Sequence, residues 1–226
     1  AVADLFTGMF AVQAILAALI AKDRDGLGQH IDMALFDSQL AMLANVGSGA
    51  LVSGNEPARL GNAHPTVVPY QTFETADVAI VISVGKDHQF GHLCRELLQR
   101  PDIAEDERFA TNSARVIHRA ALIPILADLI RQHPSEWWLA ELRRVGVPCG
   151  AVRSIHTALA APEAVARNMV YSIAHPLAGQ VPLIGSPLKL SETPIVEPVA
   201  PPLLGQHSAE VLGTLLGYSE SQIAAA

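Results

Sequence analysis

The sequence predicts an α/β fold in which helices and strands form separate packed layers. Three observations predict it: a long apolar helical segment at the start, β-rich runs around short turns, and several amphipathic helical segments between them. Half of the 226 residues are hydrophobic and 16% are charged. That composition supplies ample material for a buried core and argues against a disordered chain.

The first predicted element is a helix over residues 4–22, which is apolar on nearly all sides and therefore typical of a buried helix. Its longest apolar run, residues 9–21, is interrupted by Gln13. Because that run is short for a bilayer span, we expect no membrane partner. The elements expected after it are a turn at 25–28, a strand at 29–35 and a second helix at 36–52.

The middle of the chain predicts a loop followed by a hairpin. Residues 53–69 are rich in Gly, Pro and Asn, which indicates a loop and a domain boundary. Two β-rich runs flank Asp77 and end at Gly85, and Ser135 is expected to cap a later helix. The other expected elements are helices at 86–99, 112–131, 134–145 and 156–168, a strand within 145–152, β-rich chain over 169–197, a proline-rich linker at 194–202 and a short terminal helix.

Charge and cysteine usage exclude some classes of protein. The net charge of −7 argues against nucleic acid as a partner, because a phosphate backbone needs a basic surface. Cys94 and Cys149 are far apart in the sequence and suit a reducing, cytoplasmic setting. Among the histidines, His88 and His92 alone have ligand spacing, with no third ligand or nearby Glu, so we expect no metal site.

Six short motifs run through the chain. They are residues 2–9 (VADLFTGM), 26–37 (GLGQHIDMALFD), 61–65 (GNAHP) with Pro69 and Tyr70, 106–115 (DERFATNSAR), 146–150 (GVPCG), and 187–191 (PLKLS) with 201–207 (PPLLGQH). Each motif is weak alone. In this order, over nearly the whole chain, they resemble the C-terminal half of the class III CoA-transferase family, the CaiB/BaiF family of carnitine dehydratase, bile-acid-inducible and formyl-CoA transferase-like proteins.

The resemblance implies a partial Rossmann-like large domain, a smaller α+β domain and two monomers interlocked as a homodimer. Residues 1–55 would be the C-terminal part of the large domain and carry the catalytic aspartate. Residues 56–168 would form the linker and small domain, and residues 169–226 a return linker with a terminal helix. The chain opens on Ala1 and enters a helix at once, which we interpret as a sequence cut from something longer, with most of the CoA nucleotide site upstream.

Asp4 is the predicted catalytic residue. From the sequence alone, an aspartate at a helix start is ordinarily a cap, where the free N–H groups and the helix dipole favour its charge. The resemblance implies a nucleophile that attacks an acyl-CoA, forms an aspartyl anhydride and then an aspartyl-CoA thioester, and passes CoA to a carboxylic acid. It implies no cofactor, since coenzyme A is a substrate.

The predicted substrate-binding residues are Gly61, Asn62, Ala63, His64 and Pro65. They stand where the family carries a mobile, glycine-bearing loop over the aspartate, and His64 is a candidate to bind a substrate carboxylate or position a carbonyl. Gly61 can adopt a positive φ, but the loop lacks the run of glycines that other family members have. An ordinary interdomain loop is the alternative interpretation.

Two other functions stay open beside acyl-CoA:carboxylate CoA transfer. An α-methylacyl-CoA racemase has the same fold, but it needs a histidine that the family places upstream, and the residues after Asp4 look more like the transferases. The third hypothesis is an inactive truncated homologue that serves as a dimerisation module. The expected setting is the cytoplasm, with neither nucleic acid nor membrane as a partner.

Overall fold

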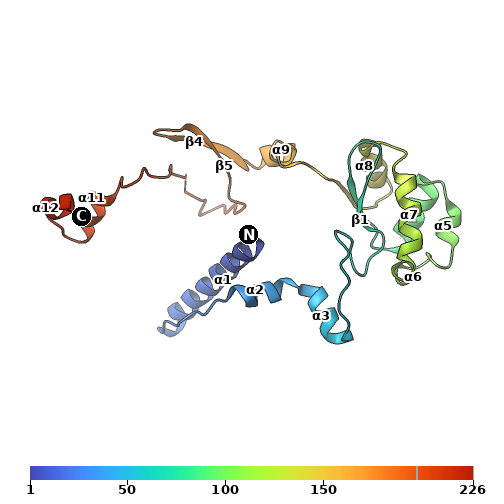
Figure 1. Cartoon of the computed structure of the whole chain (residues 1–226), viewed down its shortest axis with the longest axis horizontal. Helices are drawn as coiled ribbons and strands as arrows, with labels where there is room; N and C mark the ends of the chain where they lie inside the picture. Colours follow the sequence, from blue (N-terminus) through green and yellow to red (C-terminus); the bar gives the residue numbers. More distant parts are fainter. Residues whose placement is uncertain (197, 226) are drawn as a thin grey trace. The chain divides into compact units, whose positions relative to one another are not determined.

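The computed structural model describes residues 1–196 and 198–225, and it shows a mixed chain of helices and sheets, which confirms the predicted α/β class (Figure 1). The chain divides into two compact units, residues 1–152 and the residues from Arg153 on. The predicted boundaries at 55 and 168, the Rossmann-like layer and the interlocked dimer stay predictions. Residue 197 of the predicted linker and residue 226 lie outside the described residues.

The first unit begins with three helices. They are α1 (Val2–Asp25), α2 (Leu35–Met42) and α3 (Ala44–Ser53). Gly26 ends α1 in the left-handed conformation with a φ of 76°, as the predicted turn requires. The expected helix at 36–52 is interrupted between α2 and α3, where Ala44 has a φ of 46°.

The predicted burial of α1 is wrong for this chain. No residue of α1 is buried, and Leu5 and Ile20 are each 69% exposed. Its main neighbour is α2, an 8-residue helix that is too short to cover a helix of 24 residues. The argument from length is also wrong, since the helix is 24 residues long. Within the described residues, α1 alone is long and apolar enough to cross a membrane, a test that core helices and signal sequences also pass.

The predicted strand at residues 29–35 is wrong. Residues 27–34 have no regular secondary structure, and α2 begins at Leu35. The alternation of apolar and polar residues there has the period of a strand. A strand also needs a neighbouring backbone to satisfy its N–H and C=O groups. In the described part of the chain no strand pairs with this segment.

A three-stranded antiparallel sheet follows, with strand order β1-β2-β3. The predicted hairpin is confirmed: β1 (Tyr70–Phe73) pairs with β2 (Ile80–Ser83), with Tyr70 opposite Ser83. The predicted strand within 145–152 is also confirmed, as β3 (Cys149–Ala151). It pairs with β2 across a sequence gap that holds all the helices packed on this sheet.

Those helices are shorter than the sequence predicts. The expected helix at 86–99 is an α-helix continued by a π-helical turn, the one at 112–131 breaks at His118, and a short helix at 101–105 was not predicted. The elements are α4 (Asp87–His92), η1 (Leu93–Leu97), α5 (Pro101–Glu105), α6 (Asn112–Ile117), α7 (Arg119–Ile130) and α8 (Ser135–Arg144).

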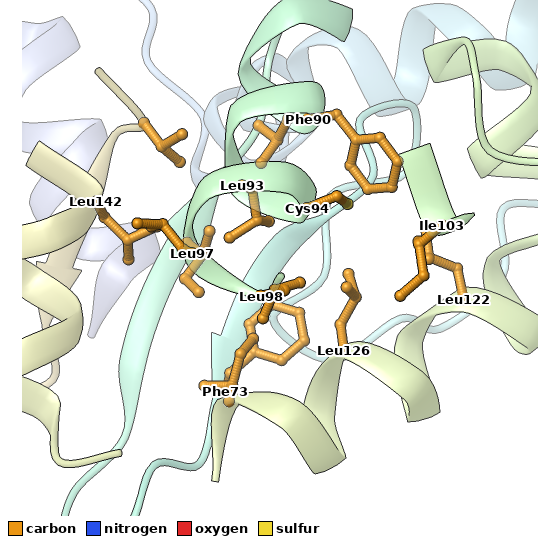
Figure 2. Packing of buried hydrophobic residues seen from close by; sticks show 14 of the residues in the cluster. Phe73, Phe90, Leu93, Cys94, Leu97, Leu98, Ile103, Leu122, Leu126 and Leu142 are labelled. Atoms are coloured by element: carbon orange, nitrogen blue, oxygen red, sulfur yellow. The ribbon is translucent and has the colours of Figure 1, made fainter. Parts of the chain in front are cut away.

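The main hydrophobic cluster of the described residues is formed by side chains between residues 68 and 147 of the first unit. Phe73 of β1 meets Leu97 and Leu98, while Leu122 and Leu126 of α7 close the cluster from another side (Figure 2). Leu122 and Leu126 are fully buried, as their spacing of one helical turn allows. The sheet and its helices therefore form a closed core of their own.

Asp77, in the turn between β1 and β2, caps helix α8. Ser135 was predicted to cap this helix, but it is the first helical residue and its own amide donates to the Asp77 carboxylate over 2.8 Å. The Thr75 hydroxyl and the backbone N–H groups of Ser135 and Val78 donate to the same carboxylate and hold the pKa of Asp77 well below its usual range. Asp77 in the hairpin turn therefore has a structural use, as the cap of α8.

The second unit is a hairpin between short helices. The hairpin pairs β4 with β5 in antiparallel register, which confirms the β-rich segment predicted after residue 169. The predicted helix at 156–168 is two short helices. The elements are α9 (Ile155–Leu159), α10 (Pro162–Ala166), β4 (Val170–His175), β5 (Gly179–Ile184), α11 (Ser208–Glu210), η2 (Val211–Leu215) and α12 (Glu220–Ala225).

Candidate active site

Asp4 lies in the first turn of α1, and its side chain is exposed. The N-cap position is Ala1, and no side chain caps the helix, so Asp4 does not act as the cap that its place in the sequence suggests. Thr7 uses its hydroxyl to donate to the Ala3 carbonyl one turn back. Within the described residues, the Asp4 carboxylate forms no hydrogen bond or ion pair, so it is accessible to a reactant.

The loop of predicted substrate-binding residues begins with a left-handed glycine, since Gly61 has a φ of 63°. Asn62 then pairs with strand β1 in both directions. The Asn62 side-chain NH2 group donates to the Thr72 hydroxyl over 2.6 Å. The Thr72 backbone N–H donates to the side-chain oxygen of Asn62 over 3.1 Å. The start of the loop is therefore attached to the sheet, and the positive φ predicted for Gly61 is confirmed.

His64 is held on three sides. Its backbone amide donates to the Tyr70 carbonyl over 2.8 Å, and its ring stacks on the Tyr70 ring with centroids 5.2 Å apart. The Nδ1 atom accepts a hydrogen bond from the Thr66 amide over 3.2 Å. In this arrangement the ring proton is on Nε2, and that atom has no hydrogen-bond partner in the part of the chain that the structure describes. It is free to donate to a ligand.

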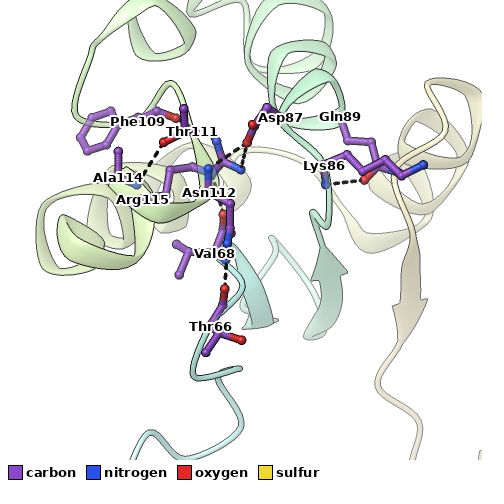
Figure 3. Close-up of polar contacts among 10 residues, drawn as sticks. All are labelled: Thr66, Val68, Lys86, Asp87, Gln89, Phe109, Thr111, Asn112, Ala114 and Arg115. Carbon is purple, nitrogen blue, oxygen red and sulfur yellow. Dashed lines mark hydrogen bonds and ion pairs between the residues drawn. The ribbon is translucent and has the colours of Figure 1, made fainter. Parts of the chain in front are cut away.

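Arg115 organises the chain just after the loop, and it is fully buried. Its guanidinium donates to the Val68 carbonyl over 2.7 Å, to the Phe109 carbonyl over 2.9 Å and to the Asp87 carboxylate over 2.8 Å (Figure 3). It also lies over the Phe90 ring, 4.4 Å from the ring centre. The buried charge is thus satisfied by two carbonyls, one carboxylate and one aromatic face.

Asn112 adds a second attachment beside Arg115. Its side chain donates to the Thr66 carbonyl over 2.7 Å and accepts from the Val68 amide over 3.0 Å, as Figure 3 shows. Its own backbone amide donates to Asp87 over 2.8 Å. Asn112, at the start of α6, therefore pairs with the backbone of Thr66 and Val68, just after the loop.

Arg119 completes the attachments of the loop. Its guanidinium donates to the His64 carbonyl over 2.7 Å and to the Pro65 carbonyl over 3.0 Å. The five predicted loop residues are thus gathered on one scaffold, made of β1 and the α6–α7 segment. No hydrogen bond or ion pair among the described residues joins this loop to Asp4. Their pairing in one site stays a prediction.

The residues that hold the loop were not recognised from the sequence. Arg115 and Asn112 stand in the fourth motif, but nothing there indicated that they reach back 44 to 47 residues to Val68. The sequence around Arg119 and Thr72 gave no indication that they contact the loop. The one available signal was the spacing of Arg115 and Arg119, four apart and so expected on one side of a helical segment.

The histidine pair that was weighed as a metal site has another arrangement. His92 does have a glutamate beside it, contrary to the sequence argument: its Nδ1 lies 2.5 Å from Glu96, and this contact lowers the pKa of Glu96. His88 contacts the His92 ring edge-on. Within the described residues no three His, Cys, Asp or Glu side chains gather as a metal ion would need.

A cavity in the second unit lies outside the predicted site. It has a volume of about 660 Å³, and its lining includes Asn168, Tyr171 and Lys189. None of the predicted catalytic or substrate-binding residues lines it. The cavity is therefore not evidence for the predicted roles of Asp4 and the loop.

Known proteins resemble this chain over nearly its whole length. The sequence model of a family described as CoA-transferase family III matches residues 1–208. A succinate–glutarate CoA-transferase of Agrobacterium fabrum is 42% identical over 215 residues, which are 95% of this chain and 54% of that protein. The human succinyl-CoA:glutarate CoA-transferase is 34% identical over 99% of this chain and 51% of its own length.

Solved structures agree with the sequence relatives. The crystal structure of a CaiB/BaiF family protein from Brucella suis superimposes with a TM-score of 0.75 at 43% sequence identity, over 94% of this chain and 55% of that one. The chain thus spans about half the length of the relatives that it matches.

Proposed function

The chain belongs to CoA-transferase family III, and from that membership we propose that it transfers coenzyme A between an acyl-CoA and a carboxylic acid, with Asp4 as the covalent carrier. The observation that carries the proposal is the state of Asp4. It stands in the motif of residues 2–9, at the exposed first turn of a long helix, and its carboxylate is not used by any described residue.

The proposed reaction has two halves. The Asp4 carboxylate attacks the thioester carbonyl, the C–S bond breaks, and an aspartyl–acyl anhydride and CoA thiolate form. The thiolate then attacks the aspartyl carbonyl of the anhydride, which gives an aspartyl-CoA thioester and releases the first carboxylate. An acceptor carboxylate attacks this thioester, and the same two steps in reverse produce the new acyl-CoA and restore Asp4.

The position of Asp4 suits these steps. Each step passes through a tetrahedral oxyanion, which needs hydrogen-bond donors in place before the charge develops. The first turn of a helix has N–H groups without intrahelical partners, and the helix dipole there favours negative charge. Helix α1 is 24 residues long, so its dipole is fully developed. The nucleophile is therefore in an environment that favours anions.

The loop at Gly61–Pro65 is proposed to exclude water while the anhydride exists, because anhydrides hydrolyse readily. Its attachment to β1 and to Arg119 supports this role, since a cover must keep its shape to exclude water. The free Nε2–H group of His64 can donate to a substrate carboxylate or carbonyl. We assign that contact to the acid end of the substrate.

The relatives indicate the substrate class. Two of them are named for succinate or succinyl-CoA and glutarate, and another for acetyl-CoA and oxalate. We propose short dicarboxylic acids and their CoA thioesters as substrates, with no cofactor, in the cytoplasm and without nucleic acid or membrane. The exposed apolar residues of α1 support assembly with further protein surface, and an interlocked homodimer is the proposed form.

The proposal is tested by trapping the carrier. The full-length protein is incubated with succinyl-CoA, quenched with hydroxylamine or borohydride, digested and analysed by mass spectrometry. We expect a hydroxamate or a reduced side chain at Asp4, because both reagents attack aspartyl-CoA thioesters. Asp37→Asn is the matched control, since Asp37 is also an exposed acid in the first turn of a helix, and it should keep the adduct that Asp4→Asn abolishes.

Two other outcomes would replace the proposal. Exchange of the α-proton of a branched acyl-CoA, without any adduct, would indicate a racemase. Absence of adduct, exchange and CoA binding would indicate a dimerisation module without activity.

A further inference from the structure

Three backbone carbonyls, two in the Gly61–Pro65 loop and one just after it, accept hydrogen bonds from two arginines. Arg115 donates to the carbonyl of Val68, and Arg119 donates to the carbonyls of His64 and Pro65. The two arginines flank the break at His118, with Arg115 in α6 and Arg119 at the start of α7, and both donate to the segment from His64 to Val68. One short segment therefore fixes the loop at both His64 and Val68.

The loop is also attached to strand β1. Asn62 exchanges two hydrogen bonds with Thr72, and the His64 amide donates to the Tyr70 carbonyl. The left-handed Gly61 comes immediately before these attachments. The loop is thus attached both to β1 and to Arg119. Gly61, which adopts a positive φ, precedes these attachments and is the place where the backbone can bend most easily.

The side-chain hydrogen bonds of Arg119 within the described residues all go to this loop. Arg119 is half-buried, and within the described residues it forms no ion pair with a carboxylate. Arg115, by contrast, is part of the core and pairs with Asp87. Hydrogen bonds from a charged donor to a carbonyl contribute more than neutral ones. The two bonds of Arg119 are therefore directed at the placement of the loop and not at core stability.

We propose that Arg119 is a positioning residue for CoA transfer. By holding the carbonyls of His64 and Pro65, it keeps the 61–66 loop fixed against β1, so that the loop moves as one piece with the sheet and shields the anhydride from water. The shielding of the anhydride rests on the proposed function. The fixing of the loop by the Arg119 guanidinium does not depend on the reaction.

The test compares Arg119→Ala with Arg119→Lys and with Arg131→Ala in the full-length protein. Arg131 is the matched control because it caps the end of the same helix and its side chain pairs with the exposed Asp128, away from the loop. Succinyl-CoA and glutarate are supplied together, and thioester hydrolysis and CoA transfer are measured in the same reaction. We expect Arg119→Ala to raise the ratio of hydrolysis to transfer roughly tenfold, because both charged hydrogen bonds that hold the loop are lost.

Arg119→Lys should recover part of that ratio, because an ammonium can replace one of the two donated bonds. Arg131→Ala should leave the ratio unchanged. Equal losses of hydrolysis and transfer in Arg119→Ala, with no recovery in Arg119→Lys, would overturn the inference, because a general loss of structure affects both reactions alike.

Amide hydrogen exchange gives a readout that needs no activity. Arg119→Ala should speed exchange at the amides of Ala63, His64 and Thr66, and Arg131→Ala should not. Unchanged exchange in Arg119→Ala would overturn the anchoring. If the wild-type protein transfers no CoA while exchange still rises, the proposed function fails and the anchoring of the loop holds, so the two failures are distinguishable.

Discussion

Two regions of the first unit differ in how they use apolar residues. Residues 68–147 contain the main buried cluster, in which Ile80, Leu122 and Leu126 have no exposed surface. Helices α1–α3 display their apolar residues, and Leu16, in the middle of α1, is 55% exposed. A high apolar content therefore does not tell whether a segment supplies its own core. What distinguishes residues 68–147 is that a sheet and several short helices pack on one another around one cluster, whereas α1 has α2 as its main neighbour.

The same division separates the proposed chemistry. Asp4, the proposed nucleophile, belongs to the exposed helices α1–α3, while the loop that we propose to shield it belongs to the region with the closed core. An enzyme gains from this arrangement when a rigid part must hold groups in place and another part must admit and release substrate. The experiments below test whether the two regions differ in solution as they do in the structure.

Replacing Arg115 with alanine should have the largest effect on stability. The change removes a buried charge, leaves the carbonyls of Val68 and Phe109 without donors and empties the space over Phe90. We expect the free energy of unfolding to fall by about 4 kcal/mol, measured by urea denaturation. Arg131→Ala, an exposed arginine, is the control and should leave the urea midpoint in place. A small loss for Arg115→Ala would contradict the central role given to this side chain.

A matched pair of leucines tests the two regions side by side. Leu126→Ala opens a cavity in a core with no exposed surface, and should lower the free energy of unfolding by about 3 kcal/mol. Leu16→Ala, on α1, should lower it by less than about 0.5 kcal/mol. A loss for Leu16→Ala that is larger at high protein concentration and shrinks on dilution would show that a second copy of the chain covers α1 in solution.

The pH dependence of stability should reveal Asp77. Its pKa is depressed in the folded protein, so the unfolded state binds its proton first as the pH falls. The stabilisation is therefore complete above the ordinary aspartate pKa, about 4, and is lost as the pH falls below it. Thermal unfolding at pH 3 and pH 6 (values on either side of about 4) should show a steeper loss for the wild type than for Asp77→Asn. Equal slopes would contradict the capping of α8 by Asp77.

The two thiols should differ in reactivity, which is the smallest expected effect. Burial raises the pKa of Cys94 to about 12, whereas Cys149 is half-buried and its pKa is raised less far from its usual value. The thiolate is the reactive form. In the folded protein at neutral pH, a chromogenic disulfide reagent should modify Cys149 slowly and Cys94 only after unfolding. Rapid modification of Cys94 would show that the core opens readily.

The sequence predicted local structure well and burial poorly. The apolar run of α1 was recognised as a helix, but burial depends on what lies against it, and its main neighbour among the described elements is α2. The alternation at 29–35 has the period of a strand, yet pairing is decided by a partner far away in the sequence. The cap of α8 comes from Asp77, 58 residues before Ser135, and no local pattern can predict such a contact.

The candidate site divides in the same way. The loop and the place of Asp4 could be predicted, because both are short contiguous motifs. The residues that position the loop could not, since Arg119 reaches His64 across 55 residues and donates to backbone carbonyls, which carry no sequence signal. An arginine that recognises main-chain atoms looks like any other arginine until the fold is known.

The use of Asp4 as the covalent carrier can be tested by following oxygen atoms. The full-length protein turns over succinyl-CoA with glutarate whose carboxylates contain oxygen-18, and the peptide that contains Asp4 is then weighed. In the proposed sequence the departing succinate takes one oxygen from Asp4, and the acceptor leaves one of its own there. We therefore predict heavy oxygen in the Asp4 side chain after turnover, and none when succinyl-CoA is omitted. Formation of glutaryl-CoA with an unlabelled Asp4 would contradict the proposal.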